Sequence, residues 1–339
     1  MTKYIIQRVL QAIPLVIVIT VIVFFLLKIS GDPLAYLAQD PRVTEADRFL
    51  LRAKYGLNDP VFPHQFVFWL AGDDWYKRDI TGDGEPDEYG TRKGVLRGDF
   101  GESIRYRKPV STVMGQFLPN TLLLGITSFI VTVVVALVIG IFAALRQYTM
   151  ADNIITSVAF ITYSMPVFLL ALILVQIFAI ELRLLPVSGM YDPRGDQSVD
   201  ELIRHMILPV ASLALINIAG WSRYIRGTML EVINSDYIRT ARSKGLSERR
   251  VTFLHALKNA SLPLVTLVGL SLPGILSGAV ITETIFSWPG MGYMYINAIE
   301  QLDQPLLSAF VLMIAVAVVF FQLVTDIVYA WLDPRIRYN

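Results

Sequence analysis

The chain has no cysteine among its 339 residues, and only 17% of its residues are charged. The missing cysteine excludes disulfides, thiolate metal sites and cysteine nucleophiles. Soluble domains carry about 25% charged residues, so the shortage of charge indicates an integral membrane protein. A hydrophobic fraction of 54% points the same way, and the net charge of +1 offers no general attraction to nucleic acid.

Several kinds of site are also missing. The three histidines, His64, His205 and His255, are far apart and form no HExxH motif, which argues against a histidine metal site. The GxxxxGK[ST] phosphate loop is absent, so the chain cannot bind ATP by that route. No paired carboxylates and no Ser–His arrangement lie near the apolar runs, which argues against a membrane enzyme.

The N-terminus resembles a signal peptide only superficially. Lys3 and Arg8 supply the positive start, but the apolar run Val9–Leu27 is 19 residues long, and no A-x-A site follows it. Signal-peptide apolar regions usually have about 7–15 residues. We therefore predict a membrane helix that is kept in the mature protein.

Six apolar runs are long enough to cross a hydrocarbon core of about 30 Å, which takes about 20 residues of helix. These runs are Ile5–Leu27, Thr121–Leu145, Ile155–Ile180, Met206–Ile225, Leu264–Phe286 and Leu306–Leu332. The sequence therefore predicts an all-α integral membrane protein with six transmembrane helices and both termini on one side.

The distribution of Lys and Arg predicts which side that is. The segment Arg226–Lys258 carries seven Lys and Arg residues, whereas Ser287–Pro305 carries none. Basic residues also lie near both termini. Because short cytoplasmic loops are enriched in Lys and Arg, we predict cytoplasmic termini and a multi-pass protein of the cell membrane.

The long segment between the first two spans then lies outside the cytoplasm. Two pieces of it have the pattern of short amphipathic helices, ended by Gly56 and Gly72, and a polar insert follows them. The predicted domains are an N-terminal membrane helix (1–29), an extracytoplasmic domain (30–117) with the polar insert (71–93), and a five-helix core (118–339) with a basic cytoplasmic loop (226–262).

Within that loop, the stretch YIRTARSKGLSERR (residues 237–250) predicts a helix, a tight turn and a second helix. Residues 234–236 supply N-cap side chains, Gly245 fits the residue after a helix end, and Ser247 restarts a helix. The positive charge of this loop could be explained by the enrichment of Lys and Arg in cytoplasmic loops, without any further function. The small side chains of Thr240 and Ala241 favour close docking against another protein instead.

The fifth span is interrupted and carries an acid near its end. Candidate gate or pathway residues are Pro273, Gly274, Gly278, Glu283 and Trp288. A proline removes a helical hydrogen bond, and glycines let neighbouring helices approach closely. An acid near the membrane is either a functional group or an interhelical hydrogen-bonding group, and the second interpretation is the simpler one.

The polar insert contains the stretch DITGDGEPDEYG, which partly matches a Ca²⁺-binding loop. The candidate ligand residues are Asp79, Thr81, Asp83, Glu85 and Asp87, and Gly84 occupies the turn position of such a loop. The bidentate glutamate at the twelfth position is missing, because Gly90 stands there. The sequence leaves two interpretations open, a Ca²⁺ site and an acidic surface turn.

Four separated motifs give the chain a specific family resemblance. They are RTARSKG followed by HALKNASLP (residues 239–263), ETIFSWPGMG (283–292), LRGDFGES (96–103) and LDPRIR (332–337). Together they resemble a first-permease (B-type) subunit of the dipeptide and oligopeptide (peptide/nickel) ATP-binding-cassette importers. The resemblance extends from residue 5 to residue 337, apart from the insert. Arg239-Thr240-Ala241 replaces the EAA of the broader permease pattern, as in other peptide permeases.

This resemblance implies a type I importer permease fold. It also implies that Ser235–Leu246 is a coupling helix that rests in a groove of a cytoplasmic ATPase. The implied contact residues are Tyr237, Arg239, Ala241, Arg242, Lys244, Gly245 and Leu246. The implied partners are a homologous second permease, two ATPase subunits and an extracytoplasmic substrate-binding protein. ATP would bind to the partner subunits, and the chain itself would be no enzyme.

The function that the resemblance implies is import of dipeptides or oligopeptides by alternating access. Oligosaccharides and nickel are alternative substrates, because similar machinery carries them. An ion-coupled secondary transporter is the alternative of another class. It predicts inverted repeats and midplane ionisable groups, and the sequence has no clear repeat.

Overall fold

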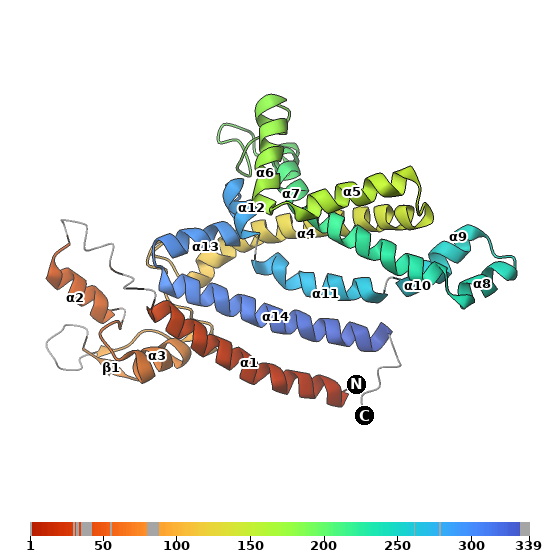
Figure 1. Ribbon diagram of the computed structural model, residues 1–339. Helices are drawn as coiled ribbons and strands as arrows, with labels where there is room; N and C mark the ends of the chain where they lie inside the picture. Colours follow the sequence, from red (N-terminus) through yellow and green to blue (C-terminus); the bar gives the residue numbers. More distant parts are fainter. Residues whose placement is uncertain are drawn as a thin grey trace. The chain divides into compact units, whose positions relative to one another are not determined.

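The computed structural model is predominantly α-helical, as predicted (Figure 1). It describes residues 2–29, 31, 34, 43–54, 56–79, 88–260, 262–277 and 279–332. The chain forms two compact units. The first comprises Met1–Val9, Pro119–Tyr293 and Ala317–Asn339, and the second comprises Leu10–Leu118 and Met294–Val316.

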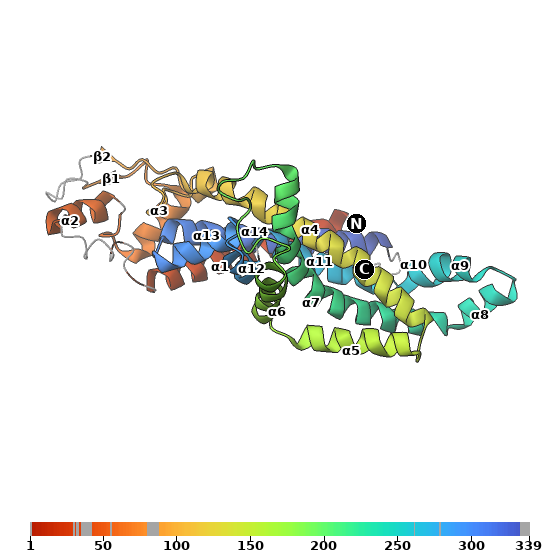
Figure 2. The same ribbon diagram turned by 90° about the horizontal axis from the view of Figure 1, so that it is seen from above.

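The first unit contains the helices that form the core. These elements are α4 (Val110–Leu145, from Pro119 onward), α5 (Met150–Ser164), α6 (Val167–Leu174) with a π-helical turn (Val175–Glu181), α7 (Val199–Ile233), α8 (Asp236–Ser243), α9 (Glu248–Arg250) with a π-helical turn (Val251–Ala256), α10 (Leu257–Ala260), α11 (Leu262–Ser277), α12 (Val280–Ile285) and the end of α14 (Gln304–Leu332). Helix α5 packs along α7, as Figure 2 shows. The Thr149 hydroxyl caps α5 and the Ser198 hydroxyl caps α7, each accepting an amide three residues on.

Three helices are long and apolar enough to cross a membrane, counted over the residues that the structure describes. They are Val110–Leu145, Val199–Ile233 and the part Gln304–Thr325 of α14. The apolar stretch Leu10–Leu26, which is part of the longer α1, and the 16-residue α11 are not counted, because each has fewer than 18 residues. The count of six spans therefore stays a prediction.

The predicted third span, Ile155–Ile180, is not one straight helix. Helices α5 and α6 meet at an angle of 108°. Pro166 lies at the bend, and Met165 before it has an extended backbone with φ −85° and ψ 131°. A residue that precedes proline avoids the helical conformation, and proline itself cannot donate the next helical hydrogen bond. The two helices make a fourth span only if the bent pair is counted as one.

Glycines allow the helices of the first unit to approach closely. A Cβ on Gly140 of α4 would lie 2.8 Å from Ile225 and from the Ser222 carbonyl oxygen of α7. A Cβ on Gly125 of the same helix would lie 2.8 Å from Ile275 of α11. Small residues at such crossings let apolar helices pack without an aqueous hydrophobic effect.

The second unit contains shorter elements. They are α1 (Thr2–Ile29, from Leu10 onward), α2 (Glu45–Lys54), a π-helical turn (Val61–Gln65) leading into α3 (Phe66–Ala71), β1 (Lys77–Arg78) paired antiparallel with β2 (Glu88–Tyr89), a 3₁₀-helix (Val95–Arg97), the start of α4, most of α13 (Met291–Glu300) and the start of α14. The two predicted short helices are confirmed. Gly56 and Gly72, which follow them, have φ of +63° and +91°.

Local side chains fix this second unit. The Thr44 hydroxyl accepts the Asp47 amide, and the Asp47 carboxylate in return accepts the Thr44 amide at 2.9 Å, which starts α2. The Arg97 guanidinium donates to both carboxylate oxygens of Asp74, at 2.6 and 2.7 Å. These hydrogen bonds lower the pKa of the Asp74 carboxyl below its ordinary value. The polar segment after α3 is thereby held to the 3₁₀-helix.

The LRGDFGES motif is explained by a buried carboxylate in the same unit. Asp303 is fully buried and accepts the Ser103 hydroxyl at 2.5 Å and the Arg105 amide at 3.2 Å. Its other oxygen lies 3.3 Å from the Leu306 amide in the first turn of α14. Residues about 200 positions apart are joined in this way, since Asp303 both caps α14 and holds the loop that ends the motif.

Candidate functional sites

The basic loop has the predicted order of helix, glycine turn and helix. Helix α7 ends at Ile233, α8 follows at Asp236–Ser243, and α9 begins at Glu248 (Figure 1). Gly245 has φ of +77°, a conformation that only glycine adopts at no steric cost. The cap differs from the prediction, because the Ser235 hydroxyl donates to the Val232 carbonyl oxygen and makes no side-chain cap on α8.

One face of α8 packs inside the chain. Ile238 is fully buried and Ala241 is 8% exposed, and both belong to a cluster with Met229, Val251 and Ala256. Leu246 is partly buried against the same cluster. The small side chain of Ala241 thus permits close packing of α8 on its own chain. Of the implied contact residues, this leaves an exposed set of Tyr237, Arg239, Arg242, Lys244 and Gly245.

An ion pair closes the glycine turn. The guanidinium of Arg242 contacts the Glu248 carboxylate through two hydrogen bonds of 3.0 and 3.3 Å. Both side chains are exposed, so the pair adds little stability by itself. It orients the turn and neutralises one cation of the loop. Arg239 likewise lies 3.6 Å from the Asp236 carboxylate, and Lys244 is among the exposed positively charged side chains of this surface.

A buried ion pair lies where α5 meets α7. Asp152 has a side chain only 3% exposed, and its two oxygens accept Arg226 Nε and Nη2, each at 2.7 Å. It also accepts the Tyr148 amide at 3.0 Å. Sequence reasoning missed this pair. Thr149 and Asp152 form a readable helix-start pattern, but the pattern gives no sign of a partner 74 residues later.

Glu283 of the ETIFSWPGMG motif accepts three hydrogen bonds through its carboxylate. It is fully buried in α12, and its Oε1 accepts the Thr121 hydroxyl of α4 at 2.9 Å. Its Oε2 accepts the Gly292 and Tyr293 amides, at 2.7 and 3.1 Å, in the first turn of α13. These contacts fit the simpler interpretation of Glu283, an interhelical hydrogen-bonding group, because its carboxylate joins three segments through hydrogen bonds.

The rest of the motif surrounds this carboxylate. The indole Nε1 of the fully buried Trp288 donates to the Asn120 carbonyl oxygen, and the Asn120 amide donates to the Pro289 carbonyl oxygen. A Cβ on Gly290 would lie 2.5 Å from Glu283 Oε2 and from the Thr121 hydroxyl oxygen. Position 290 therefore needs glycine for space, and Trp288 packs as a core residue.

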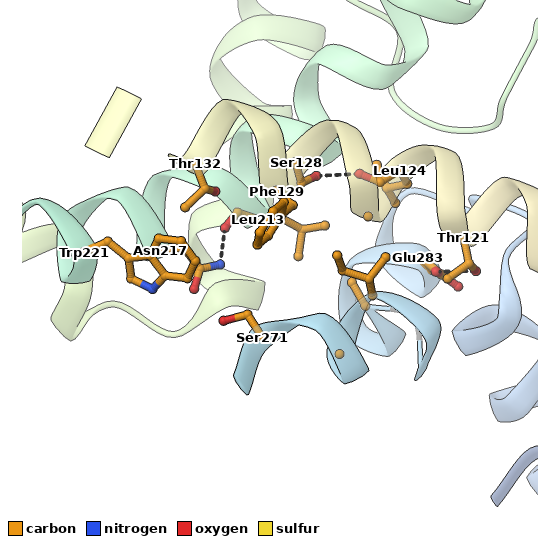
Figure 3. A pocket seen from close by; sticks show the side chains of 14 residues that line it. Thr121, Leu124, Ser128, Phe129, Thr132, Leu213, Asn217, Trp221, Ser271 and Glu283 are labelled. Atoms are coloured by element: carbon orange, nitrogen blue, oxygen red, sulfur yellow. Dashed lines mark hydrogen bonds between the residues drawn. The ribbon is translucent and has the colours of Figure 1, made fainter. Parts of the chain in front are cut away.

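A cavity of about 250 Å³ lies between α4, α7 and α11 beside Glu283 (Figure 3). Its polar lining consists of hydroxyl and amide groups, and its apolar lining includes two aromatic rings. The residues concerned are Thr121, Leu124, Gly125, Ser128, Phe129, Thr132, Leu213, Asn217, Trp221, Ser271, Gly274, Ile275, Ala279 and Glu283. Glu283 is the one ionisable side chain among these lining residues, and internal donors already engage both of its oxygens.

The predicted gate residues fall in different places. Gly274 and Glu283 line the cavity, Pro273 lies within α11, and Trp288 is in the core. Gly278 lies outside the described residues. Sequence reasoning missed the cavity hydroxyls. The side-chain amide of Asn217 donates to the Leu213 carbonyl oxygen of its own helix.

The candidate Ca²⁺ loop is only partly described. Asp79 follows β1, and Glu88 and Tyr89 form β2, so an antiparallel pair of strands flanks the loop. Thr81, Asp83, Glu85 and Asp87 lie outside the described residues. Among those that the structure does describe, no three His, Cys, Asp or Glu side chains gather into a set that could hold a metal ion.

The Glu283 contacts give a stability prediction. Glu283→Gln should lower the free energy of unfolding by about 1–3 kcal/mol, because an amide has one acceptor oxygen and cannot serve both Thr121 and the α13 amides. Thermal unfolding of the purified full chain measures the change. The matched control is Glu300→Gln, an exposed carboxylate in α13 whose replacement should change stability by less than about 0.5 kcal/mol. Equal melting temperatures for the two variants would contradict the assigned role.

The chain matches two known family models. Residues 136–338 match the model of the binding-protein-dependent transport system inner membrane component. Residues 1–125 match the model of the N-terminal region of such membrane components. The two matches together cover nearly the whole chain.

Individual relatives are similar along their full length. The oligopeptide transport system permease protein AppB of Bacillus subtilis is 39% identical over 340 residues, covering 100% of both chains. The dipeptide transport system permease protein DppB of Escherichia coli and the oligopeptide transport system permease protein OppB of Haemophilus influenzae are each 33% identical, again over 100% of both chains. The chain therefore belongs to the family of binding-protein-dependent transport system inner membrane components.

Proposed function

We propose that this chain is the membrane-spanning permease subunit of an ATP-driven importer of dipeptides and oligopeptides. The observation that carries the proposal is the full-length similarity to permeases named for those substrates, at 33–39% identity. Membership of a binding-protein-dependent family also favours an importer over an ion-coupled secondary transporter.

The cavity beside Glu283 supports a peptide substrate. Besides Glu283, its polar groups are hydroxyls and a side-chain amide. Several of them donate to carbonyl oxygens of their own helices, and their remaining hydrogen-bonding capacity suits a peptide main chain of any sequence. Nickel would favour imidazole or similar ligands, and the described lining of the cavity supplies no histidine. Of the two alternative substrates, oligosaccharides fit this cavity better than nickel, because hydroxyl-lined cavities also suit sugars.

In the proposed topology both termini and the loop 226–262 are cytoplasmic, and the segment between the first two of six spans is extracytoplasmic. A binding protein delivers substrate to that outer side, and a homologous second permease completes the pathway. The complex contains two ATPase subunits, and the exposed face of α8 rests in a groove of one of them. ATP binding and hydrolysis in those subunits move α8, and the pathway opens alternately to the two sides.

Transport by the complete complex, reconstituted in proteoliposomes, tests this function. Accumulation of labelled dipeptides or oligopeptides should require ATP on the ATPase side and the binding protein on the other side. Labelled maltooligosaccharide and ⁶³Ni²⁺, added in parallel, separate the alternative substrates. Uptake driven by an ion gradient without ATP would overturn the proposal.

The glycine turn gives a prediction on coupling. Gly245→Val strains the backbone at φ +77° but should leave the chain folded, because no atom lies within 4 Å of the added Cβ. The new side chain would project toward the ATPase. Peptide uptake should fall by about tenfold or more, since each 1.4 kcal/mol of lost docking energy is about a tenfold change in binding. ATP-dependent uptake and co-purification of the ATPases measure the effect.

The matched control is Gly98→Val in the second unit. Gly98 has φ of +78° and likewise has no atom within 4 Å of an added Cβ, so this variant carries the same backbone strain. Its uptake should stay close to that of the parent. If the Gly245 variant transported as well as this control, the proposed contact with the ATPase would be wrong.

The polar insert gives a separate prediction on Ca²⁺. If Asp79, Thr81, Asp83, Glu85 and Asp87 supply ligands, Ca²⁺ should raise the melting temperature of the full chain by a few degrees, because a ligand stabilises the state that it binds. Asp83→Ala should abolish that rise, and Mg²⁺ at the same concentration should not reproduce it. An unchanged melting temperature of the parent chain in Ca²⁺ leaves the acidic turn as the interpretation.

A further inference from the structure

An exposed aromatic surface lies in the second unit, next to the end of α1. It consists of Phe62 in the turn before α3, Trp75 and Tyr76 after α3, and Tyr89 in β2, each at least 40% exposed. We call these four residues the aromatic surface. Large aromatic side chains are costly to expose to water, so a group of them in one unit indicates an interaction site.

The position of this surface relative to a membrane follows from α1. Arg8 and Lys28 are the charged residues on either side of its apolar run. The 20 residues from one to the other rise about 30 Å in a helix, which is the thickness of the hydrocarbon core. Leu10, Ile17 and Leu26 along this run are each more than half exposed, as lipid-facing side chains of a membrane helix are.

Ring contacts then place the turn before α3 at the end of this run. Phe25 lies three residues before Lys28, about 4.5 Å along the helix axis. The ring of Phe62 lies 6.3 Å from that of Phe25. On the neighbouring side of α1, the rings of Phe66 and Trp69 lie 5.3 and 5.5 Å from that of Phe24. Phe62 is 64% exposed, so it presents an apolar ring at the depth where the hydrocarbon core ends.

The remaining members of the surface suit the next layer outward. Phe68 of α3 contacts Trp75 at 5.9 Å and Tyr76 at 5.0 Å between ring centroids. The Lys77 ammonium lies 5.7 Å from the Tyr89 ring, and the Lys28 ammonium lies at the same distance from the Phe24 ring. Tryptophan and tyrosine are enriched where hydrocarbon meets headgroups, and lysine there can reach lipid phosphates.

We propose that the described residues 61–79 and 88–89 are seated in the phospholipid leaflet at this end of α1, with Phe62 among the acyl chains and Trp75, Tyr76 and Tyr89 among the headgroups. The apolar composition of Val61–Ala71, an 11-residue stretch too short to span, agrees with an interfacial segment. The extracytoplasmic region is then fixed in height and tilt by lipid as well as by α1.

Site-directed spin labelling tests the proposal directly, because the chain has no cysteine of its own. The variants are Phe62→Cys and, as a second reporter, Val61→Cys. Each full chain is labelled, assembled with its partner subunits and placed in phosphatidylglycerol–phosphatidylcholine nanodiscs. Leu96→Cys is the matched control, because Leu96 is 73% exposed in the same unit and contributes to no aromatic contact above.

The measurement compares collisions of the label with oxygen, which concentrates in lipid, and with a water-soluble nickel chelate. Spin-labelled phospholipids in the same nanodiscs calibrate depth. We expect labels at 62 and 61 to favour oxygen several-fold, at the depth of the upper acyl chain, and the label at 96 to favour the chelate. Labels at 62 and 61 that read like 96 would overturn the proposal, as would labels shielded from both reagents, which would show a protein partner on this surface.

Discussion

The buried Glu283 carboxylate determines the form of the most recognisable part of this chain. A carboxylate in a dry, apolar environment is costly unless hydrogen bonds satisfy its oxygens. Here the Thr121 hydroxyl and the Gly292 and Tyr293 amides satisfy them. That requirement fixes α12, α4 and the first turn of α13 together, and it leaves no room for a side chain at Gly290. The motif ETIFSWPGMG is thus the sequence of one hydrogen-bonded junction. The cavity lies directly beside it, so the shape of the candidate pathway depends on the same carboxylate.

The second unit repeats this solution with Asp303, which joins the LRGDFGES loop to the start of α14. Asp152 and Arg226 do the same for α5 and α7. In each case a nearly or fully buried acid bonds to a segment far away in the chain. A membrane protein gains little from the hydrophobic effect between helices, so such polar contacts add to close packing at small residues in holding neighbouring helices together.

The sequence predicted the helical class, the two short helices after the first run, the helix–glycine–helix loop and the family. Periodicity and turn residues determine those features locally. The same reasoning did not find the bend at Pro166 within an otherwise apolar run, because a proline near the middle of a membrane helix is often tolerated. The sequence reasoning assigned Ala241 to a contact with another protein, whereas Ala241 packs within its own chain. A small residue on a helix does not indicate whether its own chain or a partner packs against it. Buried pairs such as Asp152–Arg226 depend on tertiary structure, and no local pattern reveals them. The six spans, the domain limits and the Ca²⁺ loop stay predictions.

The division of α8 into a buried and an exposed face also bears on how such transporters diversify. Ile238 and Ala241 belong to the core of the chain, so any replacement there must first satisfy packing with Met229 and Val251, whichever ATPase is present. Tyr237, Arg239 and Lys244 are free of that constraint. If the exposed face of α8 contacts an ATPase, as proposed above, duplicated importers in one cell can acquire separate ATPases, or come to share one, through changes at a few surface positions. Compatibility between subunits can evolve without any redesign of the membrane core.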